Sequence, residues 1–112
     1  MFDEEALLEQ VDGDVEFLAD TVEMLAADGP ELVNELRAAI GSADAAAVGR
    51  VAHALKGMIS NFCAPAVQEV ALELERAGKA GDLSGAPALI DRLAEQVDAL
   101  IAELNAFVQA RA

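Results

Sequence analysis

Hydrophobic and polar positions along the chain alternate with helical spacing, and polar or glycine-containing breaks divide the pattern into segments. The sequence DEEALLEQ (3–10) predicts a short first helix that ends at the turn sequence DGD (12–14). A second helix is predicted over 15–29, where apolar residues recur at the spacing of one helix face: Phe17, Leu18, Val22 and Leu25.

The first proline of the chain, Pro30, is expected to bend or break the second helix. Gly29-Pro30 interrupts the pattern, because proline lacks a backbone N–H and clashes with the preceding turn. The helical pattern then resumes over 31–41. Either Ser42 or Asp44 can cap the start of the next helix.

Three further segments follow, and the last is the longest. A helix is expected over 44–62, and another begins at Pro65, which suits a first helical turn, and ends near Gly78. Residues 79–85 predict a loop. The final helix, over 87–111, carries an apolar face of Leu89, Leu93, Val97, Leu100, Ile101, Leu104 and Val108.

These segments predict an all-α fold of five or six helices. Hydrophobic residues make up 54% of the chain but aromatic residues only 4%, a composition that suits a helical core better than a sheet. Short connections between long helices favour antiparallel neighbours. We therefore expect one domain over 1–112, an up-and-down antiparallel four-helix bundle with a short additional N-terminal helix.

Charge and cysteine content limit the partners and the compartment. Seven basic residues against 21 acidic ones give a formal net charge of −14, which disfavours nucleic acid and anionic membrane surfaces as partners. A single cysteine forms no internal disulfide, as is usual in a reducing compartment. The acidic N-terminus does not resemble a signal peptide, and no apolar run is long enough to span a membrane. We expect a cytoplasmic protein.

The only histidine, His53, is predicted to face outward. At about 100° per helical residue, the apolar stripe of its helix centres roughly 140° away from it. The stripe consists of Val48, Val51, Ala52, Leu55, Ile59 and Phe62. The polar side around His53 holds Gly49, Arg50, Gly57 and Ser60.

Two glycines and two cations surround this histidine along the helix. Gly49 and Gly57, at i−4 and i+4, suggest bare backbone that a partner can approach, although close packing of a neighbouring helix is the alternative. Lys56 at i+3 and Arg50 at i−3 are placed to offset a negative charge on the ring, or are ordinary surface cations.

The remaining chemistry points to the imidazole as a nucleophile. Ser60 lies two turns away without a GxSxG context, which gives a hydrolase little support. One histidine and one cysteine make a weak zinc site, and no phosphate-binding glycine loop is present. A near-neutral pKa is typical of histidine and leaves its free base available to form a covalent intermediate.

The sequence HALKG (53–57) resembles the His-x-Leu-Lys-Gly motif of histidine-containing phosphotransfer (HPt) domains. The similarity extends through ISNF, APA and LELERAGKAGDL, and covers nearly the whole chain with the helix layout included. The resemblance implies that His53 is the phosphoacceptor, Lys56 screens the phosphoryl charge and Gly57 leaves room for it. It further implies that Glu75 binds Nδ1 and leaves Nε2 as the nucleophile, and that Lys79 is a basic residue near the site. For Glu75, a solvated helix glutamate is the alternative.

The chain departs from this family pattern at a few positions. Cys63 stands where the family often has glycine, so local packing there is expected to differ, and we interpret it as a packed residue. Met58 and Ile59 replace two small residues, but Ile59 falls on the core stripe and Met58 near its margin. Exposed apolar contacts from Leu7 and Leu8 could assist docking, with core packing as the alternative.

By this resemblance the chain is a phosphocarrier in two-component signalling and not an enzyme in its own right. We expect a monomer that exchanges a phosphoryl group with response-regulator receiver domains, downstream of a hybrid histidine kinase. No cofactor is expected on the chain, and Mg²⁺ would sit on the receiver. Two alternatives are a helical interaction module that is never phosphorylated and a dimerising kinase-type phosphotransfer module. The second would require a hairpin that dimerises, whereas this helix count already closes a monomeric bundle.

Overall fold

A computed structural model describes residues 1–112 of the chain. Its regular elements are helices. No strand is present, so the all-α prediction is confirmed. The elements in chain order are α1 (Glu4–Gln10), α2 (Val15–Gly41), α3 (Ala45–Ile59), the 3₁₀ turn η1 (Ser60–Phe62), α4 (Pro65–Ala80) and α5 (Ala86–Gln109).

Aspartate side chains begin three of these helices. Asp3, Asp14 and Asp44 each accept a hydrogen bond from a backbone N–H three residues later, at 3.0, 3.0 and 3.1 Å. Such a side chain satisfies one of the N–H groups that a helix start leaves without a partner. Asp44 therefore caps the histidine-bearing helix, and Ser42 instead follows the end of α2.

Two helix boundaries differ from the sequence-based expectation. Helix α2 is not broken at Pro30 but continues to Gly41, because buried residues on both sides of the proline, including Leu25 and Val33, hold the segment against the core. Helix α4 passes through Gly78 to Ala80. It ends where Gly81 adopts a left-handed φ of 72°, a conformation that glycine accepts without steric cost.

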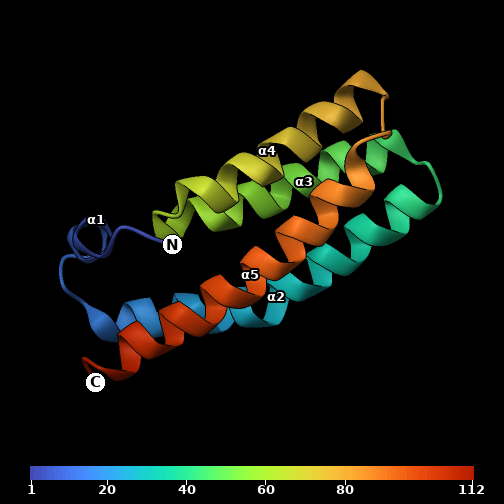
Figure 1. Cartoon of the computed structure of the whole chain (residues 1–112). Coiled ribbons are helices and arrows are strands. Elements are labelled where there is room, and N and C mark those ends of the chain that lie inside the picture. Colours follow the sequence, from blue (N-terminus) through green and yellow to red (C-terminus); the bar gives the residue numbers. More distant parts are fainter.

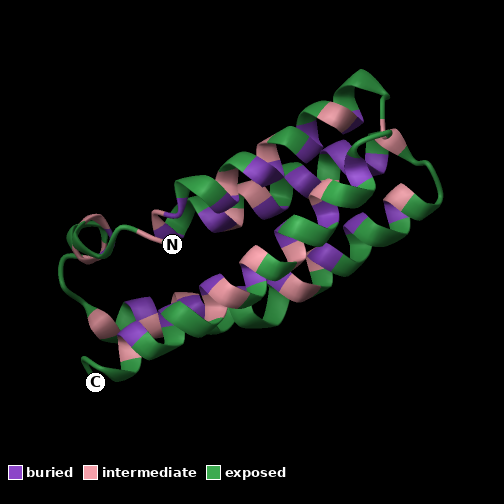
Figure 2. Cartoon of the chain, in the orientation of Figure 1, coloured by how far each residue is buried: buried purple, intermediate pink, exposed green.

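The four long helices lie side by side and enclose the core (Figure 1). Helix α2 packs against α3 and α5, and α4 packs against the same two helices. Buried residues follow the inward sides of these helices (Figure 2). Of the expected stripe on α3, every residue except the half-buried Val51 is buried. No helix is both long and apolar enough to cross a bilayer.

Helix α1 covers one end of the helical bundle beside the turn that follows α3. The Asp3 N–H donates to the Cys63 carbonyl at 2.9 Å, and the Gln10 side chain donates to the Asn61 carbonyl at 2.7 Å. Leu7 is fully buried and Leu8 is partly buried against the core. Core packing, rather than partner contact, is thus the use that the fold makes of Leu7.

One apolar residue of the expected second-helix face is not in the core. The Phe17 side chain is 55% exposed, whereas Leu18, Val22 and Leu25 are buried. Phe17 and Leu18 are neighbours in sequence and so point about 100° apart on the helix. The inward face of α2 takes Leu18 and leaves Phe17 outside it.

Candidate functional site

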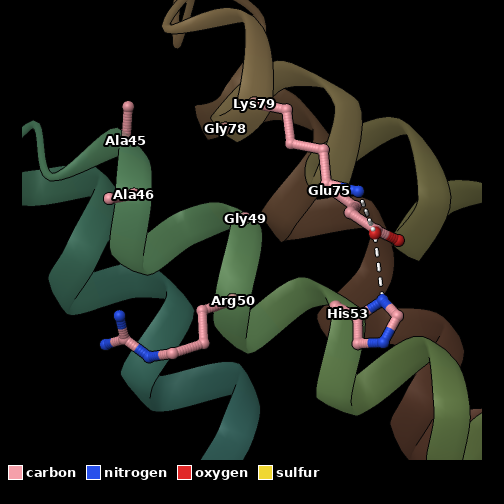
Figure 3. A pocket seen from close by; sticks show the side chains of 8 residues that line it. All are labelled: Ala45, Ala46, Gly49, Arg50, His53, Glu75, Gly78 and Lys79. Carbon is pink, nitrogen blue, oxygen red and sulfur yellow. Dashed lines mark hydrogen bonds and ion pairs between the residues drawn. The ribbon is translucent and has the colours of Figure 1, made fainter.

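The His53 side chain stands on the outer surface of α3 and is 68% exposed. This agrees with the outward orientation expected from helical periodicity. Its Nδ1 atom lies 3.0 Å from Oε2 of Glu75, which reaches it from the adjacent helix α4 (Figure 3). One ring nitrogen is therefore engaged by the protein, and the other, Nε2, is left for solvent or a partner.

Among the charged residues of the molecule, Glu75 is the one that is buried, with an exposed fraction of only 3%. Two ammonium groups flank its carboxylate: Lys56 Nζ lies 2.6 Å from Oε1, and Lys79 Nζ lies 2.9 Å from Oε2. Hydrogen bonds from Lys56 and then Lys79 lower the pKa of Glu75 from 4.5 to about 2, against the opposing effect of burial. The carboxylate is ionised at neutral pH.

The charge of Glu75 determines which nitrogen of His53 carries the proton. An ionised carboxylate accepts hydrogen bonds and cannot donate one. In the neutral ring Nδ1 must therefore donate to Oε2, and the lone pair is on Nε2. The alternative for Glu75, a solvated helix glutamate, is excluded by its burial.

The two lysines and Arg50 occupy different places relative to the ring. Lys56 and Lys79 both direct their ammonium groups to Glu75. Arg50 is exposed and forms no ion pair, and its side chain points away from His53 (Figure 3). A hollow of about 400 Å³ lies between Arg50, His53 and Lys79, with the backbone of Gly49 and Gly78 as part of its lining.

Helices α3 and α4 approach most closely where two glycines meet. A side chain at Gly78 would clash with α3, because its Cβ would lie 2.7 Å from the Cα of Gly49 and 2.8 Å from the carbonyl oxygen of Ala45. Gly49 is buried on the other side of this contact, but a Cβ there would meet α4 only at ordinary distances of 3.6–3.7 Å. Gly49 therefore lies in the helix packing considered for it as the alternative, although the packing leaves room for a Cβ at this position. From the sequence, Gly78 was interpreted only as the end of its helix, although a small residue within a helical pattern also indicates close packing of a neighbouring helix.

The other glycine beside the histidine is open. Apart from its chain neighbours and the adjacent backbone of its own helix, no heavy atom lies within 4 Å of the place where a Cβ would be at Gly57. The exposed Ser60 donates its hydroxyl hydrogen bond to the Gly57 carbonyl, within the turn that ends α3. Gly57 thus leaves bare backbone on the surface one turn after His53.

An apolar surface adjoins this open backbone. A groove of about 350 Å³ lies between α2 and α3, lined in part by Met24, Gly57 and Met58. Met24 is 62% exposed, and Phe17 lies two helical turns before it on α2. From the sequence, Phe17 was assigned to the apolar face of its helix and Met24 was given no role, so neither was expected to be an exposed apolar side chain.

Cys63 departs from the glycine common in the HPt pattern and keeps a glycine-like backbone. Its φ is 54°, in the left-handed region, and it is partly buried as a free thiol. Its sulfur lies 3.6 Å from the side-chain oxygen of Gln10 on α1. The residue therefore packs at the junction of α1 and η1.

Comparison with known proteins adds a family and a structure. A family model described as "Hpt domain" matches residues 20–103. The crystal structure of histidine-containing phosphotransfer protein B (HptB) from Pseudomonas aeruginosa PAO1 is similar, with a TM-score of 0.87 and 27% sequence identity, over 97% of this chain and 95% of that chain. A search of curated proteins found no match.

Proposed function

Because the chain belongs to the Hpt domain family, the phosphotransfer modules of two-component signalling, we propose that it carries a phosphoryl group on Nε2 of His53. Proteins of this family are phosphocarriers rather than enzymes, and they interact with receiver domains and kinases. The observation that carries the proposal is the exposed imidazole whose Nδ1 is bound by a buried, ionised carboxylate.

The transfer uses the lone pair of Nε2. This nitrogen attacks the phosphorus of a receiver aspartyl phosphate, the N–P bond forms, and the P–O bond to the aspartate breaks with the electron pair leaving on the carboxylate. The ring gains positive charge, which the Nδ1–H···Oε2 contact with Glu75 stabilises. Transfer to a second receiver reverses these steps.

Charges near the ring support the same role. Lys56, Lys79 and Arg50 supply positive charge on the histidine side of a protein whose net charge is −14. We propose that they offset the phosphoryl group's negative charge. This chain would need no cofactor, and the Mg²⁺ that organises in-line transfer would be bound by the receiver.

We infer that the receiver docks over the exposed side of α3. Gly57 is open, Ser60 is exposed beside it, and the groove beside Met24 offers apolar surface. Gly49 is buried and contributes to this surface only through its backbone, which lines the hollow next to His53. The upstream donor would be the receiver domain of a hybrid histidine kinase.

We also propose the arrangement of the helices, the number of domains and the oligomeric state. The ring of contacts among α2, α3, α4 and α5, joined by short connections, supports an up-and-down antiparallel four-helix bundle. One continuous cluster of buried hydrophobic residues supports a single domain over 1–112. We propose a monomer, and the free thiol of Cys63 is consistent with a cytoplasmic location.

A labelling experiment tests the function. A receiver domain carrying labelled phosphate is mixed with the chain and with His53→Gln, which changes an exposed side chain and should leave the fold intact. We expect label on the chain that is acid-labile and base-stable, and none on the variant. Label on the variant would exclude His53 as the acceptor. A receiver that binds the unaltered chain without passing label would favour the alternative of a non-phosphorylated interaction module.

A further inference from the structure

The carboxylate that binds His53 contacts three nitrogen-bearing side chains at once. Its Oε2 atom lies 3.0 Å from His53 Nδ1 and 2.9 Å from Lys79 Nζ. Its Oε1 atom is buried, and Lys56 Nζ at 2.6 Å is its ion-pair partner. A carboxylate, a ring and two ammonium groups thus form one cluster.

A buried carboxylate without compensating charge would change the protonation of the ring. It could take up a proton itself and donate that proton to Nδ1, which would leave the neutral ring protonated on Nε2. Alternatively, it could favour a second proton on the ring, which again places a proton on Nε2. Only an ionised carboxylate beside a neutral ring leaves Nε2 with a lone pair.

We propose that Lys56 and Lys79 are positioning residues that act on His53 through Glu75: together they keep the buried carboxylate ionised beside a neutral ring, and so keep Nε2 unprotonated. Their positive charge replaces the proton that the carboxylate or the ring would otherwise hold. The importance of this role rests on the proposed phosphotransfer at Nε2. The protonation state of His53, in contrast, is a property of the free protein and does not depend on a receiver.

The two lysines contribute unequally. The Lys56 side chain is 24% exposed and provides the ion-pair contact of Oε1. The Lys79 side chain is 72% exposed, and Oε2 would keep His53 as a partner without it. Solvent weakens an exposed ion pair, so Lys56 has the larger effect.

This role differs from screening of the phosphoryl group. Screening acts only after the phosphoryl group arrives, and it would persist if Glu75 were replaced by a neutral acceptor. A role through Glu75 acts before transfer and disappears with the carboxylate. A glutamine at position 75 would accept the Nδ1 hydrogen bond through its amide oxygen without any need for cations.

The test measures the protonation of His53 directly. The chain has one histidine, so ¹⁵N NMR of its ring reports on this site alone. In the unaltered protein we expect a proton on Nδ1 and none on Nε2 once the ring is neutral. In Lys56→Met/Lys79→Met, we expect the pH midpoint at which Nε2 loses its proton to rise by about one unit or more.

Two further variants test whether the lysines act on His53 through the Glu75 carboxylate. Adding Glu75→Gln to the lysine double variant should remove most of the rise. Arg76→Met/Arg92→Met, which removes two exposed cations that form no ion pair with Glu75, should leave the midpoint nearly unchanged. If the double variant does not fold, Lys56→Met alone can be measured in its place, because methionine keeps an apolar stem. We expect it to raise the same pH midpoint by a smaller amount.

Three results would overturn the proposal: no rise in the lysine variants, an equal rise in the arginine variant, or a rise that persists in full with Glu75→Gln. None of these measurements uses a receiver, so a failure of phosphotransfer would leave their outcome readable. With a receiver, we expect the lysine double variant to accept label about tenfold more slowly. Adding Glu75→Gln should recover the part of that loss that comes from a proton on Nε2, whereas the part that comes from lost screening of the phosphoryl group should remain.

Discussion

At the scale of single residues, the reactivity of His53 depends on one carboxylate from another helix. A neutral imidazole has two possible tautomers, and a hydrogen bond to one nitrogen selects between them. Glu75 binds Nδ1, and its ionised form fixes the proton there. The exposed side chain therefore presents a nucleophilic nitrogen without a catalytic base beside it.

The low pKa of Glu75 predicts a contribution to stability that depends on pH. The pKa is about 2 in the folded protein against an ordinary 4.5, so the folded state favours the ionised form. This contribution is present in full above the ordinary pKa and is lost as the pH falls toward 2. A difference of this size corresponds to about 3 kcal/mol of unfolding free energy for a group so deeply buried.

Unfolding of the unaltered chain and of Glu75→Gln should be compared by denaturant titration over a series of acidic pH values. We expect the stability advantage of the unaltered chain to shrink by about 3 kcal/mol between about pH 5 and pH 2. Glu73→Gln, which alters an exposed carboxyl on the same helix, should follow the unaltered chain. Parallel curves for the Glu75 variant and the unaltered chain would contradict an ionised, stabilising Glu75.

The sequence was sufficient to place His53 and Lys56 but not to describe their environment. Angular position on a helix depends only on periodicity, so the outward histidine followed from the apolar stripe of α3. The burial of Glu75 depends on how closely α4 approaches α3, which no single-helix pattern contains. The i, i+4 spacing of Glu75 and Lys79 was visible in the sequence, but its significance depended on that burial.

At the scale of elements, the site depends on the close contact between α3 and α4. Gly78 has no room for a Cβ because the backbone of α3 lies there. The same two helices carry His53 and Glu75, which lie one helical turn from Gly49 and about one turn from Gly78, respectively. The glycine contact therefore sets the separation across which the Nδ1–Oε2 hydrogen bond forms.

Alanine substitutions at Gly78 and Gly49 should have very different effects on stability and on the His53–Glu75 hydrogen bond. Gly78→Ala forces the helices apart, so we expect a loss of about 2–3 kcal/mol in unfolding free energy and loss of the His53 Nδ1–H hydrogen bond by NMR. At Gly49 a Cβ would meet only ordinary contacts of 3.6–3.7 Å. Gly49→Ala should keep the hydrogen bond and change stability by less than about 1 kcal/mol. Equal effects of the two substitutions would argue against the close contact at Gly78.

Helix number and order were predictable, whereas helix ends depended on tertiary contacts. The apolar periodicities of the helices were readable from the chain, and Asp44 was one of two candidates for the cap of α3, the other being Ser42. Local rules overstated the effect of Pro30, because packing on both sides outweighs one missing hydrogen bond. They also ended α4 at Gly78, where the glycine serves helix contact and Gly81 supplies the actual end.

At the scale of the whole molecule, a strongly acidic protein presents a small neutral-to-basic region around its histidine. The cations at this region are bound to Glu75 or stand free as Arg50, and apolar side chains of α2 lie next to it. Association depends on such local surfaces more than on net charge. The acidity of −14 is therefore compatible with binding to a receiver.

The apolar surface of α2 predicts a binding effect without a folding effect. Met24→Gln changes a side chain that is 62% exposed, so we expect unfolding free energy to change by less than about 0.5 kcal/mol. We expect the Kd for a cognate receiver to rise about fivefold, because apolar contact with the groove is lost. Ala102→Gln, on the exposed side of α5, should leave the Kd unchanged. An unchanged Kd for Met24→Gln would remove this groove from the docking surface.

We propose that Nε2 of His53 is the atom that accepts the phosphoryl group while Glu75 holds Nδ1. The most direct measurement is combined ³¹P and ¹⁵N NMR of the chain after phosphorylation by a receiver domain, with the single histidine labelled. We predict one phosphorus signal coupled to Nε2, and a ring whose Nδ1 remains hydrogen-bonded to Glu75. A phosphoryl group on Nδ1, or a base-labile phosphate on a carboxylate, would rule out Nε2 of His53 as the acceptor.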